Sequence, residues 1–262
     1  MELEASGATV HYAEHGHGRP VLVLHGAGVD HREAVATFEP ALAAHGGLRR
    51  VYPDLPGAGL TRALTTVRSA EDVLDVLFAL IDEVAGERRT ILVGHSAGAY
   101  YAQALADRAA GRVDGLVLVC PLLPGTRDVP PHRPVVADDS LGDEEFRQYF
   151  VVQTSATLER YQEAVAPGAA VADAATADRI GAHRELEPTA DAYDGPVLVV
   201  AGRQDSTVGY AAAVDLLDRY AHATLVVVDG AGHALPHETP SVLGGVLSGW
   251  LTDTMDHRAR GC

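Results

Sequence analysis

The stretch Thr90-Ile91-Leu92-Val93-Gly94-His95-Ser96-Ala97-Gly98 decides the fold of this chain. An apolar, strand-like run leads into the pattern Gly-x-Ser-x-Gly, and a helical pattern follows it. A strand, a sharp turn and a helix in this order form a nucleophile elbow, whose strained serine projects its hydroxyl from the turn. Gly94 and Gly98 suit the turn because they let neighbouring backbone approach closely. The pattern alone is common, so the rest of the sequence has to support Ser96 as a nucleophile.

Short runs of Val, Leu and Ile recur along the chain, each bounded by Gly, Pro or Asp. Runs that are apolar on both faces are typical of strands buried in a parallel sheet. Helical patterns lie between them, the clearest from Ser69 to Ala85, where Ser69 is a suitable N-cap. This alternation predicts an α/β fold. The expected strands are Val21–Leu24, Leu48–Tyr52, Thr90–Val93, Gly115–Val119, Pro196–Ala201 and Thr224–Val228, preceded by a hairpin of Leu3–Ala5 and Ala8–Ala13.

The alternation of strand and helix breaks between about Leu122 and Tyr193. A Pro-rich loop opens this stretch, and helix-like segments follow near Asp143–Gln153, Ala156–Val165 and Ala172–Gly181. We therefore predict a helical cap at residues 122–193, inserted into a core made of residues 1–121 and 194–262.

Three aromatic residues of the predicted cap, Phe146, Tyr149 and Phe150, fall at positions i, i+3 and i+4 of one helix face. This spacing is more often a packing pattern than a set of ligand contacts. A pocket-lining role is the alternative, because a cap closes over the edge of the sheet that carries the site. We take the three as candidate substrate-binding residues.

Composition excludes several classes of function. The 262 residues contain 20 basic and 36 acidic side chains, a formal charge of -16, which disfavours nucleic acid and anionic membranes as partners. Every basic residue is Arg, so chemistry that needs a lysine amine is excluded. The two cysteines, Cys120 and Cys262, allow at most one disulfide. The sequence contains no apolar run long enough to predict a membrane span. We expect a cytoplasmic protein.

A serine nucleophile requires a base and a group that orients the base, and in an elbow fold these follow in the order serine, acid, histidine. The loop after Pro196–Ala201 supplies Asp205, and the loop after Thr224–Val228 supplies His233. Both loops follow the carboxyl end of a strand, where open α/β sheets collect their sites. We predict that Asp205 is the orienting acid and His233 the general base.

An anion site completes the predicted chemistry. The strand Val21–Leu24 runs into His25-Gly26-Ala27-Gly28, whose small residues leave backbone N–H groups free to point at a developing oxyanion. We predict the N–H of Ala27 as one donor, with Gly28 as the fallback, and the N–H of Ala97 as the other. His25 is expected to be packed and to hold the loop.

Together these segments resemble the α/β-hydrolase superfamily over nearly the whole chain. The matching pieces are His25–Gly28, Asp54–Gly59, Gly94–Gly98, Gly202–Asp205, and Gly232-His233 followed by Glu238 and Pro240. The resemblance implies an eight-stranded, mostly parallel sheet with helices on both faces and a cap after strand six. Some members carry the acid after strand six, but Cys120-Pro121 stands there in this chain. Relatives that are dehalogenases or epoxide hydrolases use an aspartate nucleophile, so those activities are disfavoured.

The predicted function is that of a serine hydrolase acting on an ester, lactone or related acyl bond of a small to medium substrate, with no cofactor. A cofactor-free perhydrolase resembling haloperoxidases and a non-catalytic ligand-binding module are the alternatives. We expect no metal site, because His11, His15 and His17 are assigned structural or solvent roles. Asp54 is expected to shape a turn, and His237 to lie exposed in a loop.

Overall fold

The computed structural model describes residues 1–189 and 191–260. Within this part of the chain, nine strands form one sheet in the order β1-β2-β4-β3-β6-β7-β8-β9, with β5 paired to β2. The strands are β1 Glu2–Ala5, β2 Ala8–Gly16, β3 Arg19–Leu24, β4 Leu48–Pro53, β5 Arg62–Ala63, β6 Thr90–His95, β7 Val113–Val119, β8 Val197–Gly202 and β9 Ala223–Val228.

Six neighbouring strands are parallel, in the order β4-β3-β6-β7-β8-β9, whereas β1 and β2 pair antiparallel at one edge of the sheet. In the centre, β3 pairs with β6 so that Leu24 lies opposite Gly94, and β6 pairs with β7 so that His95 lies opposite Val119. The carboxyl ends of these strands therefore meet at one edge of the sheet. The loops that leave this edge are the ones that carry the predicted site residues.

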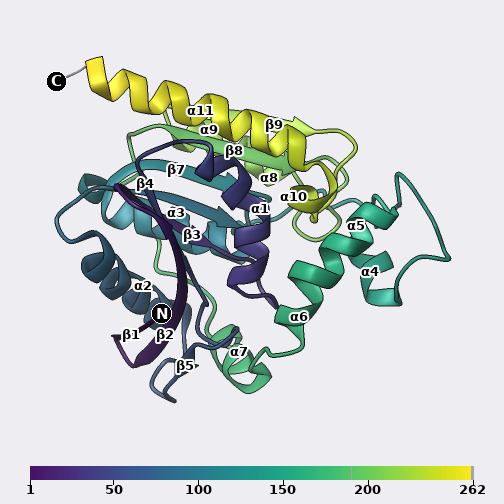
Figure 1. Cartoon of the computed structure of the whole chain (residues 1–262), viewed down its shortest axis with the longest axis horizontal. Coiled ribbons are helices and arrows are strands. Elements are labelled where there is room, and N and C mark those ends of the chain that lie inside the picture. Colours follow the sequence, from purple (N-terminus) through teal and green to yellow (C-terminus); the bar gives the residue numbers. More distant parts are fainter. Residues whose placement is uncertain (190, 261–262) are drawn as a thin grey trace.

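Helices cover both faces of the sheet, because alternate residues of each central strand point to opposite sides. Leu22, Leu92 and Leu116 pack in a cluster with α2 and α3, while Val21 and Val93 pack in a second cluster with α1 and α11. The helices outside the β7–β8 connection are α1 His31–Ala43, α2 Ala70–Ala85, α3 Ala97–Arg108, α8 Ala211–Val214, α9 Leu216–Arg219, α10 Leu235–Glu238 and α11 Pro240–Arg260. Figure 1 shows α1 and α11 on the near face.

Helix α2 forms where the sequence predicts it. The Ser69 side chain accepts a hydrogen bond from the Asp72 N–H, and Glu71 and Asp72 place negative charge in the first turn. The apolar stripe of the helix is buried against the sheet. These residues are Val73, Val76, Leu77, Leu80, Ile81 and Val84.

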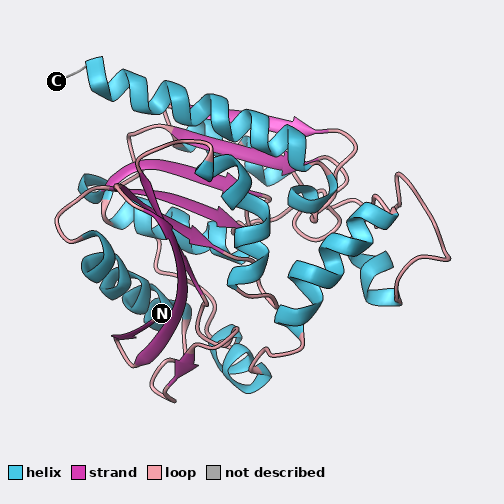
Figure 2. Cartoon of the chain, viewed as in Figure 1, coloured by secondary structure: helices cyan, strands magenta, loops and turns pink. Residues whose placement is uncertain are grey.

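The chain between β7 and β8 carries α4 Glu144–Tyr149, α5 Ser155–Arg160, α6 Ala166–Ala169 and α7 Ala174–Gly181, with a π-helical turn at Tyr161–Val165 joining α5 to α6. In Figure 2 the helices α4 to α6 stand on the side toward which the arrows of the parallel strands point. Helix α5 contacts α10, and α6 contacts α1. Helix α4 is shorter than predicted, because the chain turns extended at Phe150 and Val152 bridges to Val136.

The predicted α/β-hydrolase fold class is confirmed, with one addition. The two-residue strand β5 joins the eight expected strands, and it is too short to show a periodic pattern in the sequence. The division into a core and a cap at residues 122–193 stays a prediction. In the described part of the chain, no helix combines the length and the apolar character needed to cross a membrane.

Candidate active site

Ser96 occupies the sharp turn between β6 and α3. Its backbone has φ 54° and ψ -117°, a left-handed conformation that strains a residue with a side chain. A Cβ on Gly94 would lie 2.4 Å from the carbonyl carbon of Gly98, and a Cβ on Gly98 would lie 2.3 Å from the oxygen of Leu24. Only glycine fits at both positions, so the pattern around Ser96 is a steric requirement of the turn.

The structure brings Ser96, His233 and Asp205 into one hydrogen-bonded chain. His233 Nε2 lies 2.9 Å from the Ser96 hydroxyl, and His233 Nδ1 lies 2.8 Å from Asp205 Oδ2. The three side chains come from the turn after β6, the loop after β9 and the loop after β8. All three residues are buried, with Asp205 fully inaccessible. The arrangement allows the serine proton to pass to the imidazole while the carboxylate fixes the ring.

Asp205 is held in its charged form by its neighbours. Its second oxygen, Oδ1, accepts hydrogen bonds from the backbone N–H groups of Thr207 and Val208, each at 2.9 Å. Burial alone would raise the pKa of Asp205, but the hydrogen bond and charge of His233 and these two amides lower it below the usual value. A buried, ionised acid beside the imidazole can stabilise the positive charge that forms when His233 takes a proton.

The predicted oxyanion loop lies against the elbow. A Cβ on Gly26 would lie 3.5 Å from the Cβ of Ser96. Within the described chain, the N–H groups of Ala27 and Ala97 donate to no protein acceptor, so both are free for a ligand. His25 is buried, as expected: its Nδ1 donates to the Gly26 carbonyl at 2.7 Å, and its Nε2 accepts from the Leu55 N–H at 2.9 Å. Burial lowers the pKa of His25, which keeps the ring neutral for these roles.

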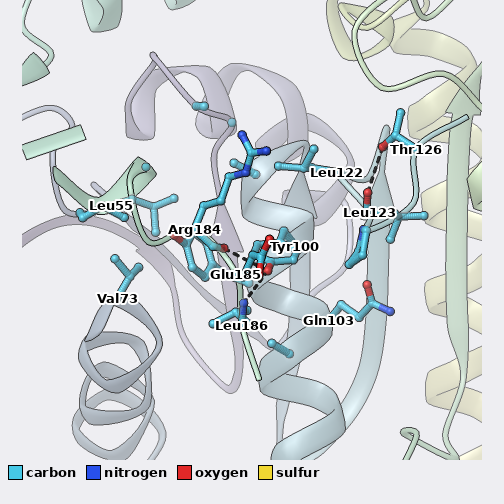
Figure 3. Close-up of a pocket in the computed structure, with 18 of the residues that line it drawn as sticks. Leu55, Val73, Tyr100, Gln103, Leu122, Leu123, Thr126, Arg184, Glu185 and Leu186 are labelled. Carbon is cyan, nitrogen blue, oxygen red and sulfur yellow. Dashed lines mark hydrogen bonds between the residues drawn. The ribbon is translucent and has the colours of Figure 1, made fainter. Parts of the chain in front are cut away.

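A cavity of about 1270 Å³ opens beside this loop, and Ala27, Gly28 and Ala97 form part of its wall. Figure 3 shows Tyr100, one turn beyond the elbow on α3, reaching the segment after α7. The Tyr100 hydroxyl donates to the Arg184 carbonyl at 3.1 Å and accepts from the Leu186 N–H at 2.9 Å. These bonds tie the far wall of the cavity to the helix that carries the nucleophile.

The three predicted substrate-binding aromatics do not line this cavity. Phe146 and Phe150 are fully buried and pack on each other at a ring-centroid distance of 4.9 Å, together with Tyr161. For these two residues the packing interpretation of the spacing describes the structure better than the pocket-lining one. Tyr149 is partly exposed, and its ring lies edge-on to His233 with centroids 6.1 Å apart. Of the three, only Tyr149 adjoins the candidate site.

We expect Tyr149→Ala to change the ratio of kcat/KM between short and long acyl esters by an amount equivalent to ~1–3 kcal/mol, because the substitution opens space beside His233. Phe146→Ala is the matched control from the same helix. It should lower the free energy of unfolding by ~3–5 kcal/mol, as lost core packing does, and leave the ranking unchanged. Steady-state kinetics on an ester series and denaturant unfolding measure both effects. An unchanged ranking in Tyr149→Ala would show that the specificity wall lies elsewhere.

Glu238 ties the segment after α4 to the loop that carries the base. Its Oε1 accepts hydrogen bonds from the N–H groups of Val151 and Val152 at 2.6 and 3.2 Å, and its Oε2 accepts one from the Gly232 N–H at 2.6 Å. Burial raises the pKa of Glu238 to about 7, outweighing the amides, which favour the charged form. Asp205 adds to the rise.

This shift predicts a pH-dependent stability. The folded chain binds the Glu238 proton more tightly than the unfolded chain, in which the pKa of this side chain is about 4.3. The contribution of this proton to the free energy of unfolding is therefore fully present below that pH and is lost as the pH rises through about 7. The expected loss is of order 3 kcal/mol. Thermal unfolding of wild type and Glu238→Gln from pH 4 to 8 should show the variant gaining relative stability as pH rises. The exposed Glu163→Gln should track wild type; parallel curves for all three would refute the assignment.

A buried charged cluster behind the triad escaped prediction. Glu33 on α1 lies with its Oε1 3.0 Å from His95 Nδ1 and 3.6 Å from His237 Nε2. His237 was expected to be exposed, and that expectation is wrong: the residue is 1% exposed within α10, where it contacts Glu33. The reason is a contact between residues far apart in the sequence, His237 of α10 and Glu33 of α1, which no local sequence pattern indicates.

Two groups in the described chain bring three potential metal-ligand atoms within 4.8 Å of one another. In the first, His11 and His31 each place Nδ1 2.8–2.9 Å from an Asp54 oxygen, and each oxygen also accepts a backbone N–H. This is the geometry of a hydrogen-bonded turn, which agrees with the structural role expected for Asp54. His15 and His17 are exposed and lie outside the group.

The second group is His95, Cys120 and His233. Both ring nitrogens of His233 already have partners, Asp205 and Ser96, so neither nitrogen is left to bind a metal ion. Cys120 is a buried free thiol, as expected, and burial raises its pKa well above the usual value. Its possible disulfide partner, Cys262, lies outside the described residues. The absence of a metal and of a cofactor stays a prediction.

Comparison with known proteins agrees with this architecture. The model of the alpha/beta hydrolase family matches residues 21–243. A 2-hydroxymuconate semialdehyde hydrolase from Pseudomonas sp. (strain CF600) is 29% identical over 88% of this chain and 86% of its own. A crystal structure of an alpha/beta superfamily hydrolase from Oenococcus oeni PSU-1 superposes with a TM-score of 0.87 at 26% identity, covering 97% of this chain and 99% of that one. A thermophilic esterase from Thermogutta terrifontis shares the fold at 20% identity, with a TM-score of 0.69 over 97% and 99% of the two chains.

Proposed function

Because this chain belongs to the alpha/beta hydrolase family, we propose that it is a serine hydrolase that cleaves an ester, lactone or related acyl bond of a small to medium substrate. The observation that carries the proposal is the continuous contact from the Ser96 hydroxyl through both nitrogens of His233 to Asp205. A serine without an aligned base is a weak nucleophile, and here the base lies within proton-transfer distance.

The reaction proceeds in two steps. His233 Nε2 takes the Ser96 proton as the serine oxygen attacks the substrate carbonyl, and the free N–H groups of Ala27 and Ala97 stabilise the oxyanion. The protonated Nε2 then gives its proton to the leaving group, which departs and leaves an acyl-serine. Water, deprotonated by the same nitrogen, attacks the acyl-serine. The bond between the acyl carbon and the Ser96 oxygen then breaks, Nε2 returns its proton to that oxygen, and the carboxylic acid product leaves. The chain and water supply every proton in this cycle, so no cofactor is required.

The cavity supports a small-molecule substrate. Its wall includes the apolar side chains of Leu55, Val73, Leu122 and Leu123, and it also carries charged side chains such as Arg184 and Glu185. The apolar part of this wall suits an uncharged or weakly polar acyl group. The similarity to a hydrolase of 2-hydroxymuconate semialdehyde adds that compound to the substrates worth assaying. The cytoplasmic location inferred from the cysteine content also stays part of this proposal.

A fluorophosphonate probe tests the proposal directly, because it labels only an activated serine. We expect one label, located on Ser96 by peptide mass spectrometry, and hydrolysis within a panel of esters and lactones of increasing acyl length. Failure of the folded protein to label would favour the ligand-binding alternative. Halogenation that requires both peroxide and added carboxylate, with slow ester hydrolysis, would favour the perhydrolase.

A further inference from the structure

Glu33 is a buried carboxylate that the proposed mechanism does not use. It lies on the first turn of α1 and is 1% exposed, and His95 and His237, on either side of it, are equally buried. Its neighbours are Thr37 at 3.4 Å, His95 at 3.0 Å and His237 at 3.6 Å, all measured to Oε1. An isolated buried carboxylate is costly, so the charge has to be compensated by these rings.

The position of the compensating proton follows from one hydrogen bond and one close contact of His95. His95 Nε2 is 3.1 Å from the main-chain oxygen of His233 and must donate, because a carbonyl oxygen only accepts. His95 Nδ1 lies 3.0 Å from Glu33 Oε1, so a proton on that nitrogen would face the carboxylate. A ring with both nitrogens protonated is a cation, and the pair is then Glu33⁻ with His95⁺. The competing arrangement puts that proton on Glu33 and leaves His95 neutral.

The surroundings favour the charged arrangement. Burial would raise the pKa of Glu33, but the charge of His95 and the contacts with His237 and His95 hold it well below its usual range. Burial would lower the pKa of His95, but Glu33 raises it above its usual value. Buried ion pairs seldom add net stability over apolar packing, so stability alone does not account for the pair.

The pair reaches the active site in two ways. His95 precedes Ser96 in the chain and holds the carbonyl of His233, the residue that carries the base. The His95 ring also lies beside the His233 ring, with centroids 5.2 Å apart, so the positive end of the pair faces the base. The other groups that face His233 are Asp205 after β8, Tyr149 on α4 and Cys120 after β7. The negative charge of Glu33 also acts on His25 and Tyr149, where it contributes in the direction of a higher pKa.

We propose that Glu33 and His95 are positioning residues, a buried charge pair that holds His233 through its main-chain carbonyl and keeps a positive charge beside the base. This inference rests on the proposed serine hydrolase function. Glu33→Gln removes the charge but retains the size of the side chain, and His95 can still donate to the His233 carbonyl as a neutral ring. The variant therefore separates the electrostatic role from the packing role.

We expect Glu33→Gln to move the acidic limb of the kcat/KM profile upward by about one pH unit, because loss of the nearby cation makes the base easier to protonate. On the acidic side kcat/KM then falls roughly tenfold, while the alkaline plateau stays within about twofold. Glu33→Asp keeps the negative charge, so its profile should shift less than that of Glu33→Gln. Glu39→Gln is the matched control: it lies on the same helix and pairs with Arg50 and Tyr52 away from the site, so its profile should follow wild type.

Histidine NMR of ¹⁵N-labelled wild type tests the pair without any variant. We expect the His95 ring to show two protonated nitrogens at pH 7.5. A neutral His95 at that pH, or coincident pH profiles for wild type and a folded Glu33→Gln, would overturn the inference. The two proposals fail differently: a wild-type protein that no fluorophosphonate labels refutes the hydrolase, whereas normal labelling with a neutral His95 refutes only the charge pair.

Discussion

Ser96→Ala is expected to abolish turnover and to leave the fold intact. Removal of the nucleophile from a serine triad costs of order 10⁶ in kcat, because the remaining residues have no atom to form the acyl-enzyme. The fold should persist, since Ser96 already carries a Cβ at φ 54° and alanine adds no atom to the turn. Hydrolysis and fluorophosphonate labelling should both vanish, with an unchanged circular dichroism spectrum and thermal unfolding.

Ser206→Ala is a suitable control for this experiment. Ser206 follows Asp205 directly, and its hydroxyl lies 3.4 Å from His132 Nδ1, away from His233. Its loss should leave labelling and kcat close to wild type. Residual labelling of the Ser96→Ala protein near the wild-type rate, mapped to another serine, would remove Ser96 from the mechanism.

The fold could be predicted from sequence because its signals are local. Buried parallel strands appear as short apolar runs, and the elbow requires glycines at fixed offsets from Ser96, since any Cβ at Gly94 or Gly98 collides with backbone. The candidate triad was found in the same way. Asp205 and His233 each follow a recognisable strand, and parallel strands deliver such loops to one edge of the sheet.

The features that escaped prediction depend on contacts between distant segments. Glu33 meets His95 and His237 only because α1, the end of β6 and α10 converge on one point. His11 Nδ1 lies 2.9 Å from Asp54 Oδ2, and its ring lies beside that of His31, so its contacts are with residues distant in the sequence. The spacing of Phe146 on α4 and Phe150 directly after it indicates that they share a side, but not whether that side meets the core or a substrate. Periodicity identifies a face, and only tertiary packing identifies its partner.

Asp205→Asn should lower kcat by roughly 10⁴-fold, as loss of the orienting carboxylate does in serine triads. The local contacts explain why the loss should be large here. Oδ1 of Asp205 accepts two backbone N–H bonds, from Thr207 and Val208, so the amide oxygen of an asparagine would take that place. Its NH₂ group would then face His233 Nδ1 and require that nitrogen to accept. The ring proton would sit on Nε2, the nitrogen that has to accept the proton of Ser96.

The asparagine variant should therefore fold normally and bind substrate with a KM near that of wild type, while the chemical step fails. Asp229→Asn is the matched control, because Asp229 lies one strand away at the surface and contacts Arg203 instead of His233. Single-turnover acylation with an activated ester measures the step itself and avoids any change in product release. If Asp205→Asn acylated within a few-fold of wild type and Asp229→Asn were severely impaired, Asp229 would have to be the acid. That outcome would require the loop after β9 to rearrange, since His233 Nδ1 now lies 2.8 Å from Asp205.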